Sequence, residues 1–127
     1  MKKSENEIMA RKVLIIDDDT RNIFALNATL KAKGYECLSA TSAQQGMAYL
    51  GNSPDIGIVL MDMMMPGMDG YEAIPKMKEN FSLPIIAVTA QAMTGDREKC
   101  LQAGADDYIS KPVNVDRLLG ILNTYLK

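Results

Sequence analysis

The feature that most constrains the fold of this sequence is an apolar run, residues 56–61, that ends abruptly at the carboxylate of Asp62. A run this apolar and rich in β-branched residues is typical of a strand with both faces buried in a parallel sheet. Pro66 lacks an N–H and Gly67 favours a turn, so the strand cannot continue through them. We therefore expect Asp62 at the carboxyl end of a strand, where open α/β sheets bind ligands. The alternative is that Asp62 only caps the loop or the next helix.

Five segments in all have the character of strands, and each is followed by a segment with the apolar spacing of a helix. The predicted strands are residues 12–16, 36–40, 56–61, 85–88 and 107–110. This repeated β-then-α order predicts a parallel sheet with helices on both faces. We expect a single α/β domain over residues 11–127, a doubly wound (βα)5 sandwich that follows a polar tail at residues 1–10.

Capping residues and glycines predict where the helices begin and end. The first helix is expected to begin with Thr20 as its N-cap and to end at Gly34. The other helices are expected over residues 42–50, 71–80, 94–104 and 114–126. Pro75 lies inside the third helix and removes a backbone hydrogen bond, which predicts a kink or a late start there.

Charge and hydropathy exclude several classes of protein. The formal net charge is −2 and the pI is near 5.1, so no basic surface for nucleic acid or an anionic membrane is expected. No apolar run approaches the roughly 20 residues that span a bilayer. The first residues lack the apolar core of a signal peptide, and we expect a cytoplasmic location by default.

The chain contains no histidine and only two cysteines, Cys37 and Cys100, which form no C-x-x-C pair. A zinc site is therefore not expected, and both cysteines are expected to be free thiols that pack as small apolar groups. Any phosphohistidine would have to come from a partner. The methionines that flank Asp62 are expected to pack in the core or line a loop rather than bind a soft metal. They are Met61, Met63, Met64, Met65 and Met68.

Polar side chains follow four of the five predicted strands. These are Asp17 and Asp18, then Asp62, Thr89 and Lys111. Because all strands of a parallel sheet end on the same side, we expect three carboxylates, a hydroxyl and an ammonium on one face. Three other acidic residues are expected to serve as turn and cap residues, namely Asp19, Asp69 and Asp106.

A cluster of carboxylates requires a cation or bound protons. Two like unit charges at ~4 Å repel by about 4 kcal/mol at an effective dielectric constant near 20. Lys111 supplies one positive charge, which does not balance three carboxylates. A hard divalent ion with oxygen ligands fits best, and Mg²⁺ suits a site with few protein ligands.

Mg²⁺ also bridges phosphate oxygens, so the same cluster is suited to a phosphoryl group. Carboxylates form aspartyl-phosphates, which makes Asp62 a candidate nucleophile. Thr89 and Lys111 would each bind a phosphoryl oxygen, one as a neutral donor and the other as a cation.

Together these residues resemble the receiver domain of two-component response regulators. The matching stretches are residues 17–18, 60–62, 65–70, 89–90 and 108–112, and the similarity spans about residue 11 to the C-terminus. Residues 17–22 and 92–100 are most similar to receivers of hybrid histidine kinases and stand-alone phosphorelay proteins. The resemblance implies the flavodoxin-like fold, with strand order 2-1-3-4-5.

The resemblance also implies a role for each matching residue. Asp62 would be the phosphoacceptor and one of the metal ligands. Asp18 would bind Mg²⁺ directly and Asp17 largely through water, with the backbone carbonyl of Met64 as a further ligand. In this family the bond between the residues matching Lys111 and Pro112 is often cis.

Two residues would carry the response, the switch hydroxyl of Thr89 and the switch aromatic ring of Tyr108. Phosphorylation would draw in Thr89 and Lys111, and Tyr108 would fill the space that Thr89 leaves. The affected surface would comprise the helix at 94–103, the strand at 107–110 and the last helix.

The implied partners are a sensor histidine kinase or histidine phosphotransfer protein and a downstream protein target. Because the sequence ends at Lys127, output is expected through a protein partner or onward phosphotransfer, from a monomer or a phosphorylation-dependent dimer.

Two other functions remain as alternatives. The first is a Mg²⁺-dependent hydrolase or phosphatase with an aspartyl nucleophile, although the chain lacks room for the cap domain that would enclose a substrate. The second is a pseudo-receiver that never accepts phosphate, which the intact set of Asp17, Asp18, Asp62, Thr89 and Lys111 argues against.

Overall fold

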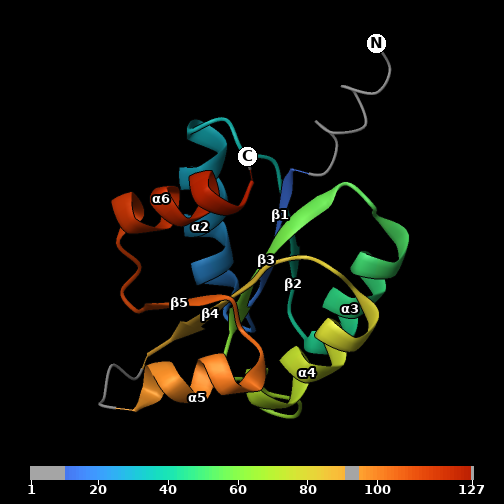
Figure 1. Ribbon diagram of the computed structural model, residues 1–127. Coiled ribbons are helices and arrows are strands. Elements are labelled where there is room, and N and C mark those ends of the chain that lie inside the picture. Colours follow the sequence, from blue (N-terminus) through green and yellow to red (C-terminus); the bar gives the residue numbers. More distant parts are fainter. Residues whose placement is uncertain (1–10, 91–94, 127) are drawn as a thin grey trace.

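The computed structural model describes residues 11–90 and 95–126, which form a sheet with helices on both sides (Figure 1). Its strands are β1 (Lys12–Ile16), β2 (Cys37–Ala40), β3 (Ile56–Asp62), β4 (Ile85–Thr89) and β5 (Asp107–Ser110). They pair in parallel in the order β2-β1-β3-β4-β5. The doubly wound fold and the strand order expected from the sequence are both confirmed.

Two layers of helices cover the sheet. The helices are α2 (Thr20–Ala32), α3 (Ala43–Asn52), α4 (Gly70–Asn80), α5 (Asp96–Ala103) and α6 (Val115–Tyr125). Helices α2 and α6 lie on one face, while α3, α4 and α5 lie on the other (Figure 1). Alternate residues of the central strands feed two separate cores: Val13 and Ile15 face α2 and α6, whereas Leu14 and Ile16 face the other layer. This alternation explains why the central strands are apolar throughout.

The first helix is capped one residue earlier than expected. Asp19, not Thr20, is the N-cap of α2, and its Oδ1 accepts the Arg21 backbone N–H at 2.9 Å. Both residue types cap helices, but a carboxylate also interacts favourably with the positive end of the helix dipole. Gly34 follows the helix with a φ of 94°, as the predicted end requires.

Helix α4 begins at Gly70, so a late start at Pro75 is wrong, while the alternative that Pro75 kinks the helix stays a prediction. Asp69 caps the helix by accepting the Glu72 N–H at 3.0 Å. The helix runs past Pro75, which lies in its second turn. The carbonyl that Pro75 leaves without its helical partner belongs to Tyr71, close to the helix start, where the cap already fixes the first turn.

Other ends of elements differ from the expectation by one or two residues. Strand β2 begins at Cys37, and β3 and β4 extend to include Asp62 and Thr89. Ser42 and Asn114 cap α3 and α6 as predicted. The polar tail at residues 1–10 and the predicted helix start at Thr94 lie outside the described residues. Both cysteines are free thiols, as expected.

None of the helices in the described ranges, 11–90 and 95–126, combines the length and apolarity that a bilayer span requires.

Candidate functional site

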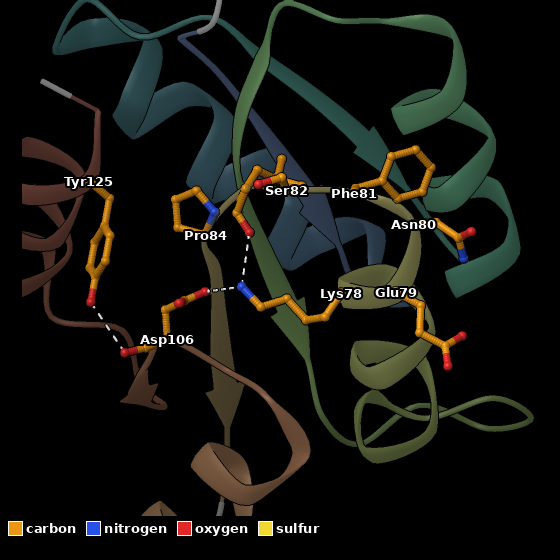
Figure 2. Close-up of a pocket in the computed structure, with 9 residues that line it drawn as sticks. Lys78, Glu79, Asn80, Phe81, Ser82, Pro84, Asp106 and Tyr125 are labelled. Atoms are coloured by element: carbon orange, nitrogen blue, oxygen red, sulfur yellow. Dashed lines mark hydrogen bonds and ion pairs between the residues drawn. The ribbon is translucent and has the colours of Figure 1, made fainter.

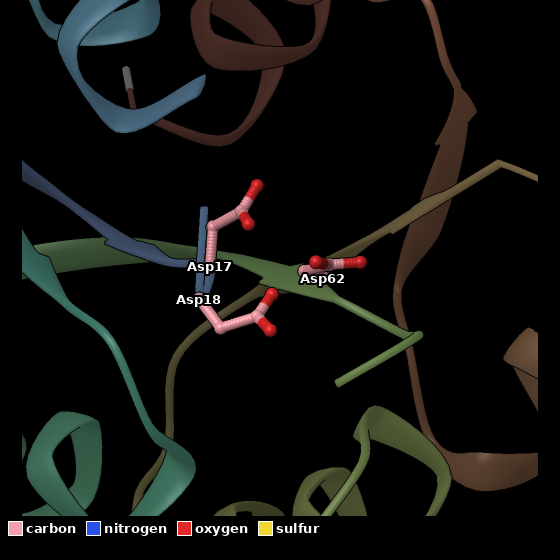
Figure 3. Close-up of side chains that lie close together, drawn as sticks. All are labelled: Asp17, Asp18 and Asp62. Atoms are coloured by element: carbon pink, nitrogen blue, oxygen red, sulfur yellow. The ribbon is translucent and has the colours of Figure 1, made fainter. Parts of the chain in front are cut away.

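The carboxylates of Asp17, Asp18 and Asp62 lie together where β1 and β3 end (Figure 3). One oxygen from each lies within 4.8 Å of the others. The Asp17 and Asp62 side chains are buried, whereas Asp18 is exposed. The cluster therefore has two buried carboxylates and one carboxylate open to solvent.

Lys111 reaches this cluster from the segment that follows β5. Its Nζ lies 3.5 Å from Asp62 Oδ2 and 3.7 Å from Asp17 Oδ2. The Lys111–Pro112 bond is cis, as expected from the resemblance. Three of the polar strand ends singled out in the sequence, those of β1, β3 and β5, thus meet at one point.

Asp17 is fixed by the start of α2. The Asp19 backbone N–H donates to Asp17 Oδ1 at 2.8 Å, and Asn22 Nδ2 donates to Asp17 Oδ2 at 3.4 Å. Asn22 was not singled out in the sequence. A signal for it was present, because the third residue of a helix that begins directly after a strand can face back toward the strand end.

The interactions around Asp62 act on its ionised form in opposite directions. Its Oδ1 accepts the Met64 backbone N–H at 3.1 Å. Burial raises the pKa of the Asp62 carboxyl above its ordinary value, and the nearby charge of Asp17 raises it further. The Met64 hydrogen bond and the Lys111 charge oppose that rise in pKa without cancelling it. The carboxylate form of Asp62 is therefore less stable here than in water.

Thr89 lies on β4, the strand next to that of Asp62, and Tyr108 lies on β5, one strand further out. Thr89 is fully buried at the end of β4, where Val88 pairs with Asp62, and its carbonyl accepts the Lys111 N–H at 2.7 Å. Tyr108 is half-buried on β5, opposite Ala87. The switch residues expected from the sequence thus lie on adjacent strands, with Thr89 on the strand next to that of Asp62.

The donor set fits a hard divalent cation. Three carboxylates offer oxygen ligands within a short distance of one another, and a single ammonium lies beside them. One side of the cluster is open through Asp18, which suits Mg²⁺ because this ion keeps several waters. The predicted contribution of the Met64 carbonyl stays a prediction.

The other acidic residues have structural roles, as predicted. Asp19 and Asp69 cap helices. Asp106 Oδ2 accepts the Ile85 N–H at 2.8 Å and pairs with Lys78 Nζ at 2.8 Å. Among the methionines near Asp62, those at 61, 63 and 65 are buried in the core, while Met64 is 51% exposed.

A wide hollow of about 550 Å³ lies at the other end of the sheet, where β4 and β5 begin (Figure 2). Lys78 Nζ donates to the Leu83 carbonyl at 3.2 Å as well as pairing with Asp106, and the Tyr125 hydroxyl donates to the Asp106 carbonyl at 3.2 Å. Lys78 thus connects the loop after α4 to Asp106, and Tyr125 connects Asp106 to the C-terminal helix α6. We assign this hollow a structural role because these polar groups bind one another.

Comparison with known proteins places this geometry among signalling domains. A family model described as the response regulator receiver domain matches residues 13–123. The polar-differentiation response regulator DivK of Brucella ovis is 34% identical over 121 residues, which cover 93% of this chain and 98% of DivK. Hybrid signal transduction histidine kinase I of Dictyostelium discoideum is 35% identical over 97% of this chain, but the match covers only 8% of that kinase.

A further relative shows the same partial coverage. Heme response regulator HssR of Staphylococcus haemolyticus is 34% identical over 91% of this chain and 51% of HssR. This chain therefore spans nearly all of DivK, about half of HssR and a small part of the hybrid kinase.

Solved structures agree in fold. A CheY-like receiver domain from Methanospirillum hungatei is 35% identical, with a TM-score of 0.81, over 91% of this chain and 93% of that chain. The receiver domain of sensor histidine kinase PA1611 from Pseudomonas aeruginosa is 32% identical, with a TM-score of 0.82, over 92% and 98%. The latter structure is described as having a magnesium ion coordinated in its active-site cleft.

Proposed function

Because the chain belongs to the response regulator receiver family, we propose that Asp62 accepts a phosphoryl group from the phosphohistidine of a partner protein. One observation carries this proposal: Lys111 lies within 3.7 Å of oxygens of both Asp62 and Asp17, while Asp18 completes a group of carboxylates suited to Mg²⁺. A nucleophile, a cation for the phosphoryl oxygens and a metal-ligating set thus lie around one point.

The transfer itself is a displacement at phosphorus. An oxygen of the Asp62 carboxylate attacks, so a P–O bond forms while the P–N bond to the partner's imidazole breaks. The departing imidazole takes up a proton from solvent. The chain has no histidine, so the phosphohistidine belongs to the partner.

The residues around Asp62 manage the charge of this step. Two anions must approach each other, and a bound Mg²⁺ would offset their charge. Asp18 and Asp17 would hold the ion, with the Met64 carbonyl as a further ligand. Lys111 would leave its position between Asp17 and Asp62 to bind a phosphoryl oxygen as a charge-assisted donor.

The signal would leave the site through Thr89 and Tyr108. Thr89 would donate to a phosphoryl oxygen, and the half-buried Tyr108 ring would move into the space that Thr89 vacates. The surface formed by α5, β5 and α6 would then change for a downstream protein. Phosphorylation would act by shifting populations, to the extent that it binds one arrangement better than the other.

The surroundings of the site support a protein as the donor. A hollow of about 270 Å³ adjoins Asp17 and Lys111 between α2 and the segment after β5, and its other walls are mostly apolar. On the outer face of α2, Phe24 is 77% exposed. An apolar hollow at the carboxylate cluster, bordered by a helix that also carries an exposed aromatic ring, is typical of a surface that packs against another protein.

Incubation with a small phosphodonor tests the proposal. The chain is mixed with Mg²⁺ and phosphoramidate, and its intact mass is followed with and without hydroxylamine, which cleaves acyl phosphates. We expect one phosphoryl group, removed by hydroxylamine, in the wild type and in the control Asp116→Asn, which alters an exposed α6 carboxylate. Asp62→Asn should take up none.

The same assay distinguishes the two alternative functions, a hydrolase and a pseudo-receiver. Catalytic turnover of simple phosphoesters would instead indicate a hydrolase. A chain that takes up no phosphoryl group from phosphoramidate or from any histidine kinase would indicate a pseudo-receiver.

A further inference from the structure

One side chain from α6, that of Arg117, makes three contacts with the first two residues of β5. Its Nη2 donates to the Tyr108 carbonyl at 2.6 Å, and the same nitrogen lies 3.6 Å from Asp107 Oδ1. Its guanidinium carbon lies 5.9 Å from the centroid of the Tyr108 ring. The guanidinium therefore binds both the backbone and the ring of Tyr108.

Arg117 is itself fixed at the start of α6. Its backbone N–H donates to the Oδ1 of Asn114, the N-cap of α6, at 2.9 Å. The chain between the two tied points, residues 109–116, contains Lys111. Arg117 thus connects the two ends of the segment that contains Lys111, between Tyr108 and α6.

Tyr108 contacts Arg117 at a position that is less buried than that of Thr89. Tyr108 is half-buried, and the Arg117 side chain beside its ring is 49% exposed. The space beside Thr89 is buried, because Thr89 itself has no exposed surface. A ring that moves toward Thr89 must leave its contact with the guanidinium, which is held by the Tyr108 carbonyl and Asp107.

We propose that Arg117 is a positioning residue for the switch: it holds the Tyr108 ring at the surface and opposes its move toward Thr89. This inference rests on the proposed function, because it assigns a regulator to the same switch. Cations over aromatic rings stabilise exposed sites modestly, so release of the ring should change its distribution roughly two- to fivefold.

Linkage gives the inference a second consequence. A change that favours the buried ring position must favour ligands that prefer this position by the same factor. Loss of Arg117 should therefore tighten binding of beryllofluoride, a phosphoryl analogue, roughly two- to fivefold in the presence of Mg²⁺. A merely structural role would loosen the fold without tightening a ligand at Asp62.

Fluorine NMR of chains that contain fluorotyrosine can follow the ring directly. The chain has five tyrosines, and the signal of Tyr108 is assigned as the one lost in Tyr108→Phe. The signal and the beryllofluoride affinity are measured in the wild type, Arg117→Gln, Arg117→Lys and Arg97→Gln. Arg97 is the matched control, an exposed arginine on α5 with no ion pair among the described residues.

In Arg117→Gln without the analogue, the Tyr108 signal should move part of the way to its wild-type position with the analogue, and affinity should rise. Arg117→Lys should show smaller changes in both than Arg117→Gln, because it returns a cation near the ring. Arg97→Gln should match the wild type. Two results would overturn the role of Arg117 alone while the wild type still responds to the analogue. In the first, Arg117→Gln behaves like the wild type. In the second, Arg97→Gln shows the same shift as Arg117→Gln. A wild type that does not bind the analogue would overturn the proposed function together with this inference.

Discussion

The Lys111 ammonium lies 3.5 Å from Asp62 Oδ2, although the two residues are 49 positions apart in the sequence. The same ammonium is 3.7 Å from Asp17, so one cation serves two buried carboxylates. The exposed Asp18 makes no ion pair among the described residues. The site therefore carries an excess of negative charge, and several properties of the protein follow from that excess.

Replacing Asp62 with Asn should stabilise the protein at neutral pH in the absence of Mg²⁺. The pKa of Asp62 is raised by burial, so the folded state binds the proton more tightly than the unfolded state. Stability is then lost as pH rises from the unfolded pKa through the folded pKa. Asp62→Asn lacks this loss, while Lys111 keeps Asp17 as a partner.

Urea unfolding of both proteins as a function of pH, with a chelator present, measures this difference. The stability advantage of Asp62→Asn should grow across the acidic window and stay constant above it. A variant less stable than the wild type at neutral pH would show that the Asp62–Lys111 contact outweighs the cost of burial.

Mg²⁺ should stabilise the folded protein, and Asp18 should be required for most of that effect. A ligand at ten times its dissociation constant adds about 1.4 kcal/mol to the free energy of unfolding. Asp18→Asn should lose most of this gain yet stay within about 0.5 kcal/mol of the wild type without Mg²⁺, because Asp18 is exposed.

Thermal unfolding with and without Mg²⁺ tests this, with Asp116→Asn as the control for loss of an exposed carboxylate. If Asp18→Asn kept the full gain in stability from Mg²⁺, the assignment of Asp18 as a ligand would be wrong.

The loop after Asp62 depends on a close approach at Gly70. A Cβ on Gly70 would lie 2.3 Å from Met63 Sδ and 2.9 Å from Met63 Cα. Because the second atom belongs to the backbone, Gly70→Ala should destabilise the protein by about 1–3 kcal/mol. Gly120 in α6 has no neighbour within 4 Å of such a Cβ, so Gly120→Ala should stabilise by about 0.5–1 kcal/mol.

Chemical unfolding of the two alanine variants provides the comparison. Equal stabilities for Gly70→Ala and Gly120→Ala would show that the loop around Met63 moves aside without cost.

The sequence predicted the parts of the site that depend on topology. Asp17, Asp62 and Lys111 each follow a strand, and a parallel sheet brings such positions to one edge whatever the details of packing. The order of the strands came from the resemblance, because alternating strands and helices are compatible with more than one order.

The details that escaped prediction depend on competing local choices or on long side chains. Asp19 and Thr20 can both cap α2, and only the position of the chain after β1 decides between them. Arg117 contacts Tyr108 across nine residues and two elements, and no spacing rule indicates which surface a guanidinium covers. Pro75 disfavours a helix locally, but the Asp69 cap and the packing of α4 outweigh that preference.

Phe24 should matter for a protein donor and not for a small one. The ring is 77% exposed on α2, the helix that borders the hollow at Asp17, and it contributes little to the core. Phe24→Ser should therefore leave labelling by phosphoramidate unchanged, because that donor needs only Asp62, Lys111 and Mg²⁺. Transfer from a phosphorylated histidine kinase that labels the wild type should slow roughly tenfold, as expected when an aromatic anchor of an interface is lost.

The two rates are measured on the same protein preparations, with Arg97→Gln on α5 as the control for a change far from α2. A parallel fall in both rates would mean that Phe24 supports the site itself. Unchanged transfer from the kinase would show that the donor does not bury this ring.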